Sequence, residues 1–395
     1  MVPRREANRP RADALTLAVA AWLCDDARLA MAYERPNITA LAAYVPGEQP
    51  AATDLVKLNT NENPYPPPEP VLEAVRGIDA EALRRYPSPT AAPFRQLAAE
   101  MHALTPEQVI ATNGGDELLR LAITVFCEPR AGGRGGRSGG GGGGGGGLGI
   151  AEPSYSLYPV LAAIHDTPVT RLGLGEGFEL PGDFADRLNA ARCRLAMLVS
   201  PHAPSGRLVP VDQLAELARR FDGVLLIDEA YVDFADGDAL ELVRAGLENV
   251  LVLRSLSKGY SLAGLRFGYG LGHAGLIAVL DKARDSYNTD AVSQAAAVAA
   301  LRHRDAAAAS CAKVRRERAR LSEALGQRRW HVGPSDANFL LATPPPEGPG
   351  AAEIYESLKA RGIYVRYFDQ QRLRDKLRIT IGTAEQNDAL LAALG

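Results

Sequence analysis

Short apolar segments alternate with helical patterns through the middle of the chain, and this alternation restricts the fold more than any other feature. Strands are expected near residues 168–172, 194–199, 224–228, 250–254 and 267–271, with a helix at about 211–221. Strands separated by helices form a mainly parallel sheet that helices cover on both faces. Functional groups of such sheets gather beyond the carboxyl ends of the strands, so the site is expected there.

At 395 residues the chain exceeds a typical single core, and more than one domain is expected. We expect an N-terminal extension over residues 1–34, with Met31 as the start of the functional protein, and an arm over 35–80 that contains a short helix. A large domain over 81–290 and a small C-terminal domain over 291–395 follow. Further helices are expected near 69–76, 91–102, 291–302 and 306–325, and further strands near 109–111, 338–342, 363–367 and 377–381.

A low-complexity stretch interrupts the large domain. Residues 139–147 are all glycine, and the stretch ends Leu148-Gly149-Ile150. A phosphate-binding P-loop would end in Gly-Lys-Ser/Thr, so that interpretation is rejected. Because glycine buries little apolar area against its backbone entropy, we expect residues 131–149 to form a mobile surface insertion.

Composition excludes several classes of partner. The net charge of −3 gives no reason to expect nucleic acid or an anionic membrane, and no apolar run approaches the ~18 residues of a membrane helix. Four cysteines are scattered without metal-ligand spacing, which argues against a metal site and a disulfide framework. A reducing compartment, the cytoplasm, is therefore expected.

The segment Ser255-Leu-Ser257-Lys258, followed by Gly264-Leu-Arg266-Phe-Gly268, comes directly after the apolar run 250–253. A lysine at the exit of a buried strand and close to a guanidinium has a lowered pKa. Such an amine is suited to form a Schiff base with a carbonyl compound. The two serines and Arg266 are suited to hold a phosphate dianion. The segment therefore predicts a nucleophilic lysine beside an anion site.

A second strand, 224–228, ends in Asp228, thirty residues before Lys258. An aspartate that faces a pyridine nitrogen keeps it protonated, as pyridoxal phosphate requires. Tyr231 follows, where it is suited to donate to the 3′ oxygen of that ring. Gly114-Gly115-Asp116 opens a helix whose free N–H groups favour a phosphate, and Tyr155 and Tyr158 offer an aromatic face for a planar ring. Core packing and helix capping are the alternative interpretations of these residues.

The order of these motifs resembles the class I and II aminotransferases, and more narrowly the histidinol-phosphate aminotransferases. The resemblance runs from about residue 35 to the end, without the glycine insertion. It rests on Leu58-Asn59-Thr60-Asn61-Glu62-Asn63-Pro64-Tyr65, Arg85-Tyr86-Pro87-Ser88-Pro89, Asn113-Gly114-Gly115-Asp116-Glu117-Leu118, Leu262-Ala263-Gly264-Leu265-Arg266, Gly362-Ile363-Tyr364-Val365-Arg366 and Leu377-Arg378-Ile379-Thr380-Ile381-Gly382-Thr383.

The resemblance implies an α/β fold of type I: a mainly parallel seven-stranded sheet covered by helices, with a smaller α+β domain from the C-terminus and the N-terminal arm. It implies pyridoxal 5′-phosphate as cofactor and amino transfer between L-histidinol phosphate and 2-oxoglutarate in histidine biosynthesis. Lys258, Asp228 and Tyr231 are the implied catalytic residues. The remaining implied cofactor ligands are Gly115, Asp116, Tyr155, Ser255, Ser257, Arg266 and, from a second copy of the chain, Tyr86; the implied substrate contacts are Tyr44, Asn61, Arg366 and Arg378. A homodimer with shared sites follows from the role of Tyr86.

One position departs from the family pattern. Ala203 stands where the family has an asparagine that bonds the 3′ oxygen of the cofactor, so either Tyr231 acts alone or His202 substitutes. Four alternatives remain open: a threonine-phosphate decarboxylase, an aromatic aminotransferase, a non-catalytic domain that senses pyridoxal phosphate, and an inactive copy.

Overall fold

The structure is a computed structural model that describes residues 33–44, 47–50, 55–130 and 146–395. The chain divides into two compact units, residues 1–42 and 43–395. Among the described residues of the first unit is the short helix α2 (Pro36–Thr39). The predicted extension 1–34 lies almost wholly outside the described residues.

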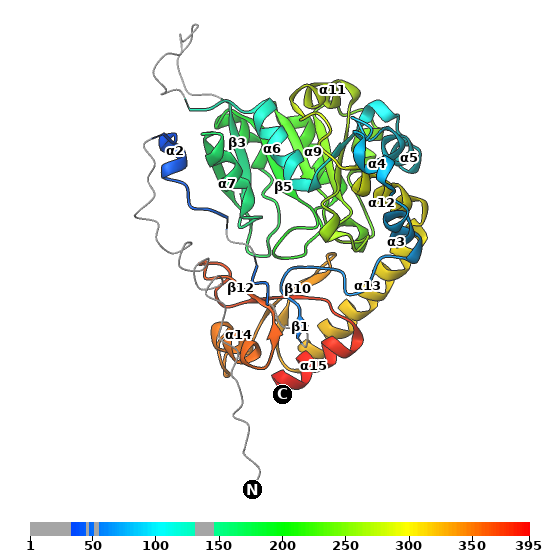
Figure 1. Ribbon diagram of the computed structural model, residues 1–395. Helices are drawn as coiled ribbons and strands as arrows, with labels where there is room; N and C mark the ends of the chain where they lie inside the picture. Colours follow the sequence, from blue (N-terminus) through cyan, green and yellow to red (C-terminus); the bar gives the residue numbers. More distant parts are fainter. Residues whose placement is uncertain (1–32, 45–46, 51–54, 131–145) are drawn as a thin grey trace. The chain divides into compact units, whose positions relative to one another are not determined.

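A seven-stranded sheet forms the centre of the second unit (Figure 1). Its order is β2-β8-β7-β6-β5-β3-β4. β8 runs antiparallel to β2 and β7, and the other neighbouring pairs are parallel. The predicted fold class is therefore confirmed. The strands are β2 (Val109–Thr112), β3 (Gly147–Glu152), β4 (Val169–Gly173), β5 (Cys193–Val199), β6 (Val224–Asp228), β7 (Val250–Ser255) and β8 (Gly268–Gly272).

Strand β3 corrects the predicted extent of the glycine insertion. The predicted insertion includes residues 147–149, but these form the first half of this strand, between β5 and β4. An added Cβ at Gly149 would lie 2.1 Å from Leu188, and one at Gly147 would lie 2.8 Å from the Pro168 carbonyl oxygen. A side chain would therefore meet the Leu188 side chain of α8 at position 149 and the backbone just before β4 at position 147, so both positions favour glycine. The rest of the predicted insertion, residues 131–145, lies outside the described residues.

Helices cover both faces of the sheet because strand side chains alternate between two apolar layers. Leu225 and Ile227 of β6 pack in the layer with α5 (Ala92–His102), α8 (Phe184–Ala190), α9 (Val211–Arg220), α10 (Leu240–Arg244) and α12 (Ala291–Arg302). Leu226 points to the opposite layer, with α6 (Gly114–Phe126), α7 (Leu157–Ile164) and α11 (Ala274–Ala283). None of the helices in the described part of the chain is long and apolar enough to cross a membrane.

The C-terminal part adds a separate apolar cluster. An antiparallel sheet of order β12-β13-β10-β9 and a two-stranded parallel pair, β1 and β11, pack against three helices. The elements are α13 (Arg304–Gln327), β9 (His331–Val332), β10 (Phe339–Thr343), α14 (Ala351–Ala360), β11 (Ile363–Tyr364), β12 (Arg366–Tyr367), β13 (Leu377–Thr380), α15 (Ala384–Leu394) and, from the N-terminal arm, β1 (Val56–Lys57). The predicted strand 363–367 is thus divided between two sheets: β11 pairs with β1, β12 pairs with β13, and the buried Val365 lies between them in the chain.

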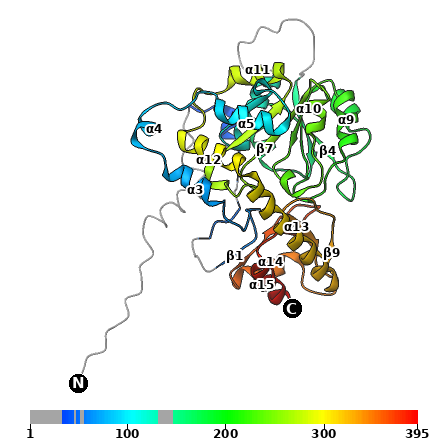
Figure 2. The ribbon, with the colours of Figure 1, turned by 90° about the vertical axis from the view of Figure 1, so that its right-hand side faces the viewer.

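The remaining elements connect these parts. α3 (Glu69–Arg76) lies against α12, as Figure 2 shows, and α4 (Ala80–Arg84) follows it. Three short 3₁₀ turns are η1 (Pro106–Gln108), η2 (Val232–Phe234) and η3 (Ala263–Leu265). The proposed domain boundaries at residues 80/81 and 290/291 remain predictions.

Candidate active site

A cavity of about 390 Å³ opens beyond the carboxyl ends of the central strands. Asp228 ends β6, Ser255 ends β7, and Gly115 lies in the first turn of α6, directly after β2. This is the edge of the sheet at which the sequence predicts a site. The predicted site residues that line the cavity are Tyr44, Asn61, Gly115, Asp116, Tyr155, Asp228, Tyr231, Ser255, Ser257, Lys258, Arg266, Arg366 and Arg378.

Lys258 brings a primary amine to the floor of this cavity. Its Nζ donates to the carbonyl oxygen of Thr60 at 3.2 Å and lies 5.8 Å from the centre of the Tyr231 ring. Burial, helped by the charges of Arg378 and Arg266, lowers the pKa of Lys258 to about 8. A larger fraction of this amine than of an ordinary lysine is therefore unprotonated near neutral pH and available as a nucleophile.

Asp228 is a buried carboxylate, 5 % exposed. Burial raises its pKa to about 6, although two hydrogen bonds oppose the shift. The hydroxyl of Tyr158 donates to Oδ2 at 2.8 Å, and the N–H of Ala230 donates to Oδ1 at 3.1 Å. These donors keep the carboxylate ionised near pH 7, as a partner for a protonated ring nitrogen must be. From the sequence, Tyr158 is expected only to contribute to an aromatic face, and this bond is not predicted.

Tyr155 lines the same cavity as Asp228. Its ring makes edge-on contacts with Tyr158, at 5.5 Å between centroids, and with Tyr44, at 6.2 Å. The preceding residue, Ser154, also lines the cavity, and its hydroxyl is buried without a hydrogen-bond partner among the described residues. An unpaired buried hydroxyl is costly unless a ligand uses it. Sequence reasoning missed Ser154, since a serine beside a tyrosine carries no pattern of its own.

An anion cradle lies at the N-terminus of α6. The first N–H groups of this helix have no partner within the helix and present donors to the cavity. The Arg266 Nη2 atom lies 3.2 Å from Asp116 Oδ2. The N–H of Ser257 donates to Ser255 Oγ at 3.1 Å, which places both hydroxyls on one loop. Gly268 of β8 is required here, because an added Cβ would lie 2.7 Å from the Gly114 carbonyl carbon.

Two arginines form a second cationic centre. Arg366 and Arg378 are directly opposite each other in the β12–β13 register. The Arg378 guanidinium lies 5.4 Å from the rings of both Phe339 and Phe368, and its Nη2 donates to the Asn59 carbonyl oxygen at 2.9 Å. Its buried Nε has no partner among the described residues. Burial lowers the pKa of Arg378. Like charges in opposition are unfavourable, and a bound anion would relieve them.

The geometry fits pyridoxal phosphate in four respects: an amine with a lowered pKa, a buried carboxylate, an aromatic ring and a phosphate cradle share one cavity. The family model described as aminotransferase class I and II matches residues 53–394. The chain belongs to this aminotransferase family. The predictions of the family and of an enzyme are therefore confirmed, and the alternative of a non-catalytic domain is not supported.

Relatives of this aminotransferase point in the same direction. Histidinol-phosphate aminotransferase 1 of Trichormus variabilis is 44 % identical over 363 residues, which cover 92 % of this chain and 98 % of the relative. The histidinol-phosphate aminotransferase of Geobacter sulfurreducens is 41 % identical over 364 residues, covering 91 % and 98 %. The fold matches the histidinol-phosphate aminotransferase of Sinorhizobium meliloti in complex with pyridoxal-5′-phosphate, with a TM-score of 0.80, 24 % identity and coverage of 93 % and 97 %.

The departure at Ala203 has a clear structural outcome in this aminotransferase. His202 cannot substitute for the missing asparagine, because both of its ring nitrogens are occupied: Nδ1 contacts Ser205 Oγ at 2.7 Å and Nε2 contacts the Pro153 carbonyl oxygen at 2.8 Å. Ala203 packs in a small apolar cluster beside Tyr231. The predicted alternative that His202 takes over is therefore wrong, and Tyr231 remains.

Tyr86 is the predicted site residue that does not line the cavity of its own chain. Its side chain is 81 % exposed, and its ring stacks on Tyr287 with centroids 4.4 Å apart. A large exposed aromatic pair of this kind is available for contact with another molecule.

Proposed function

We propose that this aminotransferase transfers an amino group between L-histidinol phosphate and 2-oxoglutarate, with pyridoxal 5′-phosphate as cofactor, in histidine biosynthesis. The observation that carries the proposal is the meeting of Lys258, Asp228 and Arg266 in one cavity that also contains Arg366 and Arg378. The names of relatives that match nearly the whole chain support the choice of substrate.

The cofactor, when bound, supplies an aldehyde for the Lys258 amine and a ring that withdraws electrons from bonds at the substrate carbon. Asp228 would hold a negative charge for the ring nitrogen, and Tyr155 would offer its ring for stacking. The helix N–H groups of Gly115 and Asp116, the hydroxyls of Ser255 and Ser257, and the Arg266 guanidinium would hold the phosphate. The Tyr231 hydroxyl would donate a hydrogen bond to the ring oxygen.

Lys258 then acts as the proton carrier. With a pKa of about 8, its Nζ would accept and return a proton near neutral pH when it is not bound to the cofactor. Thr60 holds this Nζ through its carbonyl oxygen at 3.2 Å. Lys258 would therefore be the group that moves a proton at the substrate carbon.

Arg366 and Arg378 give one site to two substrates. A guanidinium binds a phosphate monoester and a carboxylate equally well in a bidentate manner. The phosphate of histidinol phosphate and a carboxylate of 2-oxoglutarate would thus occupy the same end of the cavity in turn. Tyr44 and Asn61 line the cavity beside this end and complete the proposed substrate contacts.

We further propose a homodimer in which the exposed Tyr86 of one chain reaches the cofactor of the other. The cytoplasm is the proposed compartment, in keeping with the free thiols of Cys127, Cys193 and Cys311.

Replacement of Lys258 by alanine tests the chemistry. The purified protein should take up pyridoxal phosphate and show a visible absorbance band, which borohydride fixes to Lys258. Lys258→Ala should lose the fixation and lower turnover by about 10²–10⁴-fold or more, because it removes both nucleophile and proton carrier. The exposed Lys282→Ala variant is the matched control and should keep both. Undiminished turnover in Lys258→Ala would end the proposal.

Single amine donors test the substrate. Histidinol phosphate, phenylalanine and threonine phosphate are added one at a time without an oxo acid, and the visible band is followed. A change with histidinol phosphate is expected. A change with phenylalanine alone would assign an aromatic aminotransferase, and release of carbon dioxide from threonine phosphate would assign a decarboxylase.

A further inference from the structure

We propose that Asn61 is a positioning residue that sets the direction of the Tyr231 hydroxyl proton, so that this hydroxyl donates into the cavity. The inference deepens the proposed function and rests on it, because the acceptor inside the cavity is the bound cofactor. Its basis is the hydrogen-bond network that surrounds the Asn61 side chain.

Asn61 is held firmly at the edge of the cavity. It is 1 % exposed, and its backbone is left-handed with φ of 55°. Its N–H donates to Thr380 Oγ1 at 3.0 Å, and its carbonyl oxygen accepts from the Asn338 side-chain amide at 3.0 Å. Both partners belong to the C-terminal part of the chain, so the position of Asn61 is set by tertiary structure.

The orientation of the Asn61 amide follows from the single proton of the Thr380 hydroxyl. This hydroxyl accepts from the Asn61 N–H and donates to Asn61 Oδ1 at 3.0 Å. If the amide were turned over, the Thr380 proton would lose this acceptor. The amide nitrogen therefore faces Tyr231 and donates to its hydroxyl oxygen at 3.0 Å.

Tyr231 consequently receives one hydrogen bond and keeps its own proton for another group. Its ring is fixed by an edge-on contact with Phe339, with centroids 5.0 Å apart. The charged and titratable groups around it include Arg378, Asp228 and Tyr44, and the Lys258 Nζ lies 5.8 Å from the centre of its ring. Burial raises the pKa of Tyr231, although Arg378 and the Asn61 hydrogen bond oppose the shift. The hydroxyl therefore remains protonated near neutral pH and is a donor.

Ala203, which stands where the family has an asparagine, offers no hydrogen-bond donor beside Tyr231. Among the described residues, this cluster consists of Val199, Ala203, Ala337 and Phe339. The nearby His202 is bonded elsewhere through both ring nitrogens. Donation from this side of the cavity therefore depends on Tyr231, and its direction depends on Asn61.

Asn61→Asp reverses the direction of the hydrogen bond between residue 61 and the Tyr231 hydroxyl, while the side chain of residue 61 keeps its shape. A carboxylate only accepts, so the Tyr231 proton turns toward residue 61 and away from the cavity. Aspartate also tolerates the left-handed backbone. The readout is the midpoint pH at which the visible absorbance of bound pyridoxal phosphate changes. Loss of donation removes a hydrogen bond that favours negative charge on the cofactor, so the midpoint should rise by about one pH unit.

A second background separates this effect from that of the added charge. In the Tyr231→Phe background, Asn61→Asp still adds a charge, but there is no hydroxyl at residue 231 to turn. The change in midpoint pH caused by Asn61→Asp should therefore be about one pH unit smaller in this background than with wild-type Tyr231. The matched control is Asn59→Asp, which adds the same charge two residues away; the Asn59 amide donates to the Glu48 carbonyl oxygen. Its shift should be equal in both backgrounds.

Thr380→Val tests the same geometry without a charge. It frees the Asn61 amide to turn over and accept from Tyr231, so the midpoint should rise with wild-type Tyr231 and stay unchanged with Tyr231→Phe. Equal shifts in both backgrounds for Asn61→Asp and Thr380→Val would overturn the inference while leaving the proposed function intact. Absence of any visible band in wild-type protein would overturn both.

Discussion

At the scale of single residues, Asp228 shows how burial and hydrogen bonding act against each other. Burial alone would keep this carboxyl protonated, since the charged form loses its hydration. The Tyr158 hydroxyl and the Ala230 N–H hold its pKa at about 6. Asp228 is therefore ionised near pH 7 in a buried position because two groups donate hydrogen bonds to it. One of them, Tyr158, lies in α7.

Tyr158→Phe should raise the pKa of Asp228 and weaken the binding of pyridoxal phosphate. The variant keeps the ring but removes the donor at 2.8 Å. Because binding then requires removal of a proton from the carboxyl, affinity should fall by about tenfold at pH 6.5 and by less at pH 8.5. Titration of cofactor-free protein with pyridoxal phosphate at both pH values measures this.

Tyr269→Phe is the matched control for Tyr158→Phe. Tyr269 is also buried, 2 % exposed, but its hydroxyl contacts His102 at 3.1 Å and not a residue of the cavity. Its affinity for the cofactor should equal that of the wild type. Equal affinity in Tyr158→Phe and wild type at both pH values would mean that Tyr158 only fills space.

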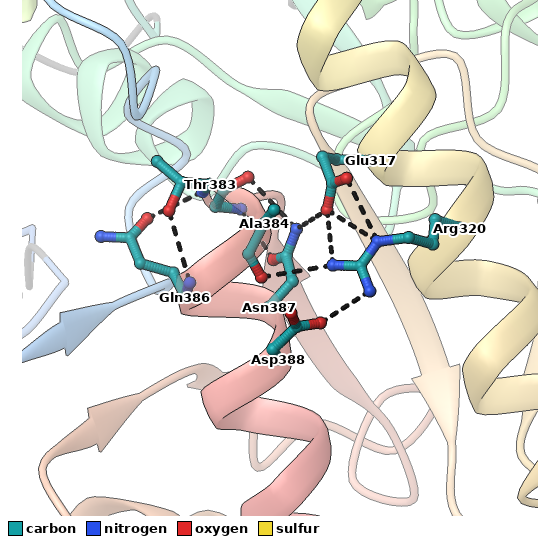
Figure 3. A network of polar contacts seen from close by, with 8 residues as sticks. Glu317, Arg320, Thr383, Ala384, Gln386, Asn387 and Asp388 are labelled. Atoms are coloured by element: carbon teal, nitrogen blue, oxygen red, sulfur yellow. Dashed lines mark hydrogen bonds and ion pairs between the residues drawn. The ribbon is translucent and has the colours of Figure 1, made fainter.

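At the scale of elements, α13 and α15 are joined by a polar network (Figure 3). The Asn387 amide donates to Glu317 at 2.9 Å, and Arg320 binds Glu317, the Ala384 carbonyl oxygen and Asp388. A capping box begins α15, with Thr383 and Gln386 satisfying each other's N–H groups. The network fixes the last helix against the long helix that precedes the C-terminal sheet.

Asn387→Ala should destabilise the C-terminal part of the chain. Asn387 is fully buried, and its Oδ1 accepts from the Gly382 N–H at 3.0 Å. The variant leaves this buried N–H without its partner and removes one of the bonds to Glu317, whose Oε2 atom keeps Arg320, at a cost of about 1–3 kcal/mol. The urea midpoint for the loss of helical circular dichroism should fall accordingly. Gln327→Ala, at the exposed end of α13, is the control and should change the urea midpoint little. If Asn387→Ala had the same midpoint as this control, the stabilising role of Asn387 would be contradicted.

At the scale of the whole molecule, buried histidines link stability to pH. Burial, together with the charge of Arg254, lowers the pKa of His102 from 6.5 to about 3. Below pH 6.5 the unfolded chain therefore binds a proton that the folded chain does not. The contribution of His102 to stability is complete above pH 6.5 and is lost as the pH falls toward 3, by about 1.4 kcal/mol per pH unit.

His102→Gln should flatten the decrease in stability between pH 6.5 and pH 5. The glutamine cannot take up a proton when the chain unfolds, so about 2 kcal/mol of pH-dependent loss should disappear. Burial also raises the pKa values of Asp228 and Glu229, and these groups add their own pH dependence. They are the same in both proteins, so the difference between the variant and the wild type reports on His102. Chemical unfolding at the two pH values measures the difference. The exposed His303→Gln variant should keep the wild-type slope; the same slope in His102→Gln would refute the linkage.

Much of the central fold follows from local pattern. The apolar runs that end at Asp228 and before Ser255 are β6 and β7, and the helix expected at 211–221 is α9, since periodicity depends only on which face of each segment is buried. The limits of the glycine insertion did not follow in this way. Glycine carries no periodic signal, and only the pairing with β4 and β5 shows that residues 147–149 belong to a strand.

By itself, the sequence determined the chemical types at the site: an amine after a strand, a carboxylate at the end of its neighbour, and serines and an arginine within a few residues of the amine. These are local features, because short spacing along the chain fixes short distances in space. Tertiary structure alone decided which hydroxyls and amides bind one another. The Tyr158–Asp228 bond spans 70 positions and the Asn61–Tyr231 bond spans 170, and contacts over such separations arise only when the whole sheet and the C-terminal strands have packed.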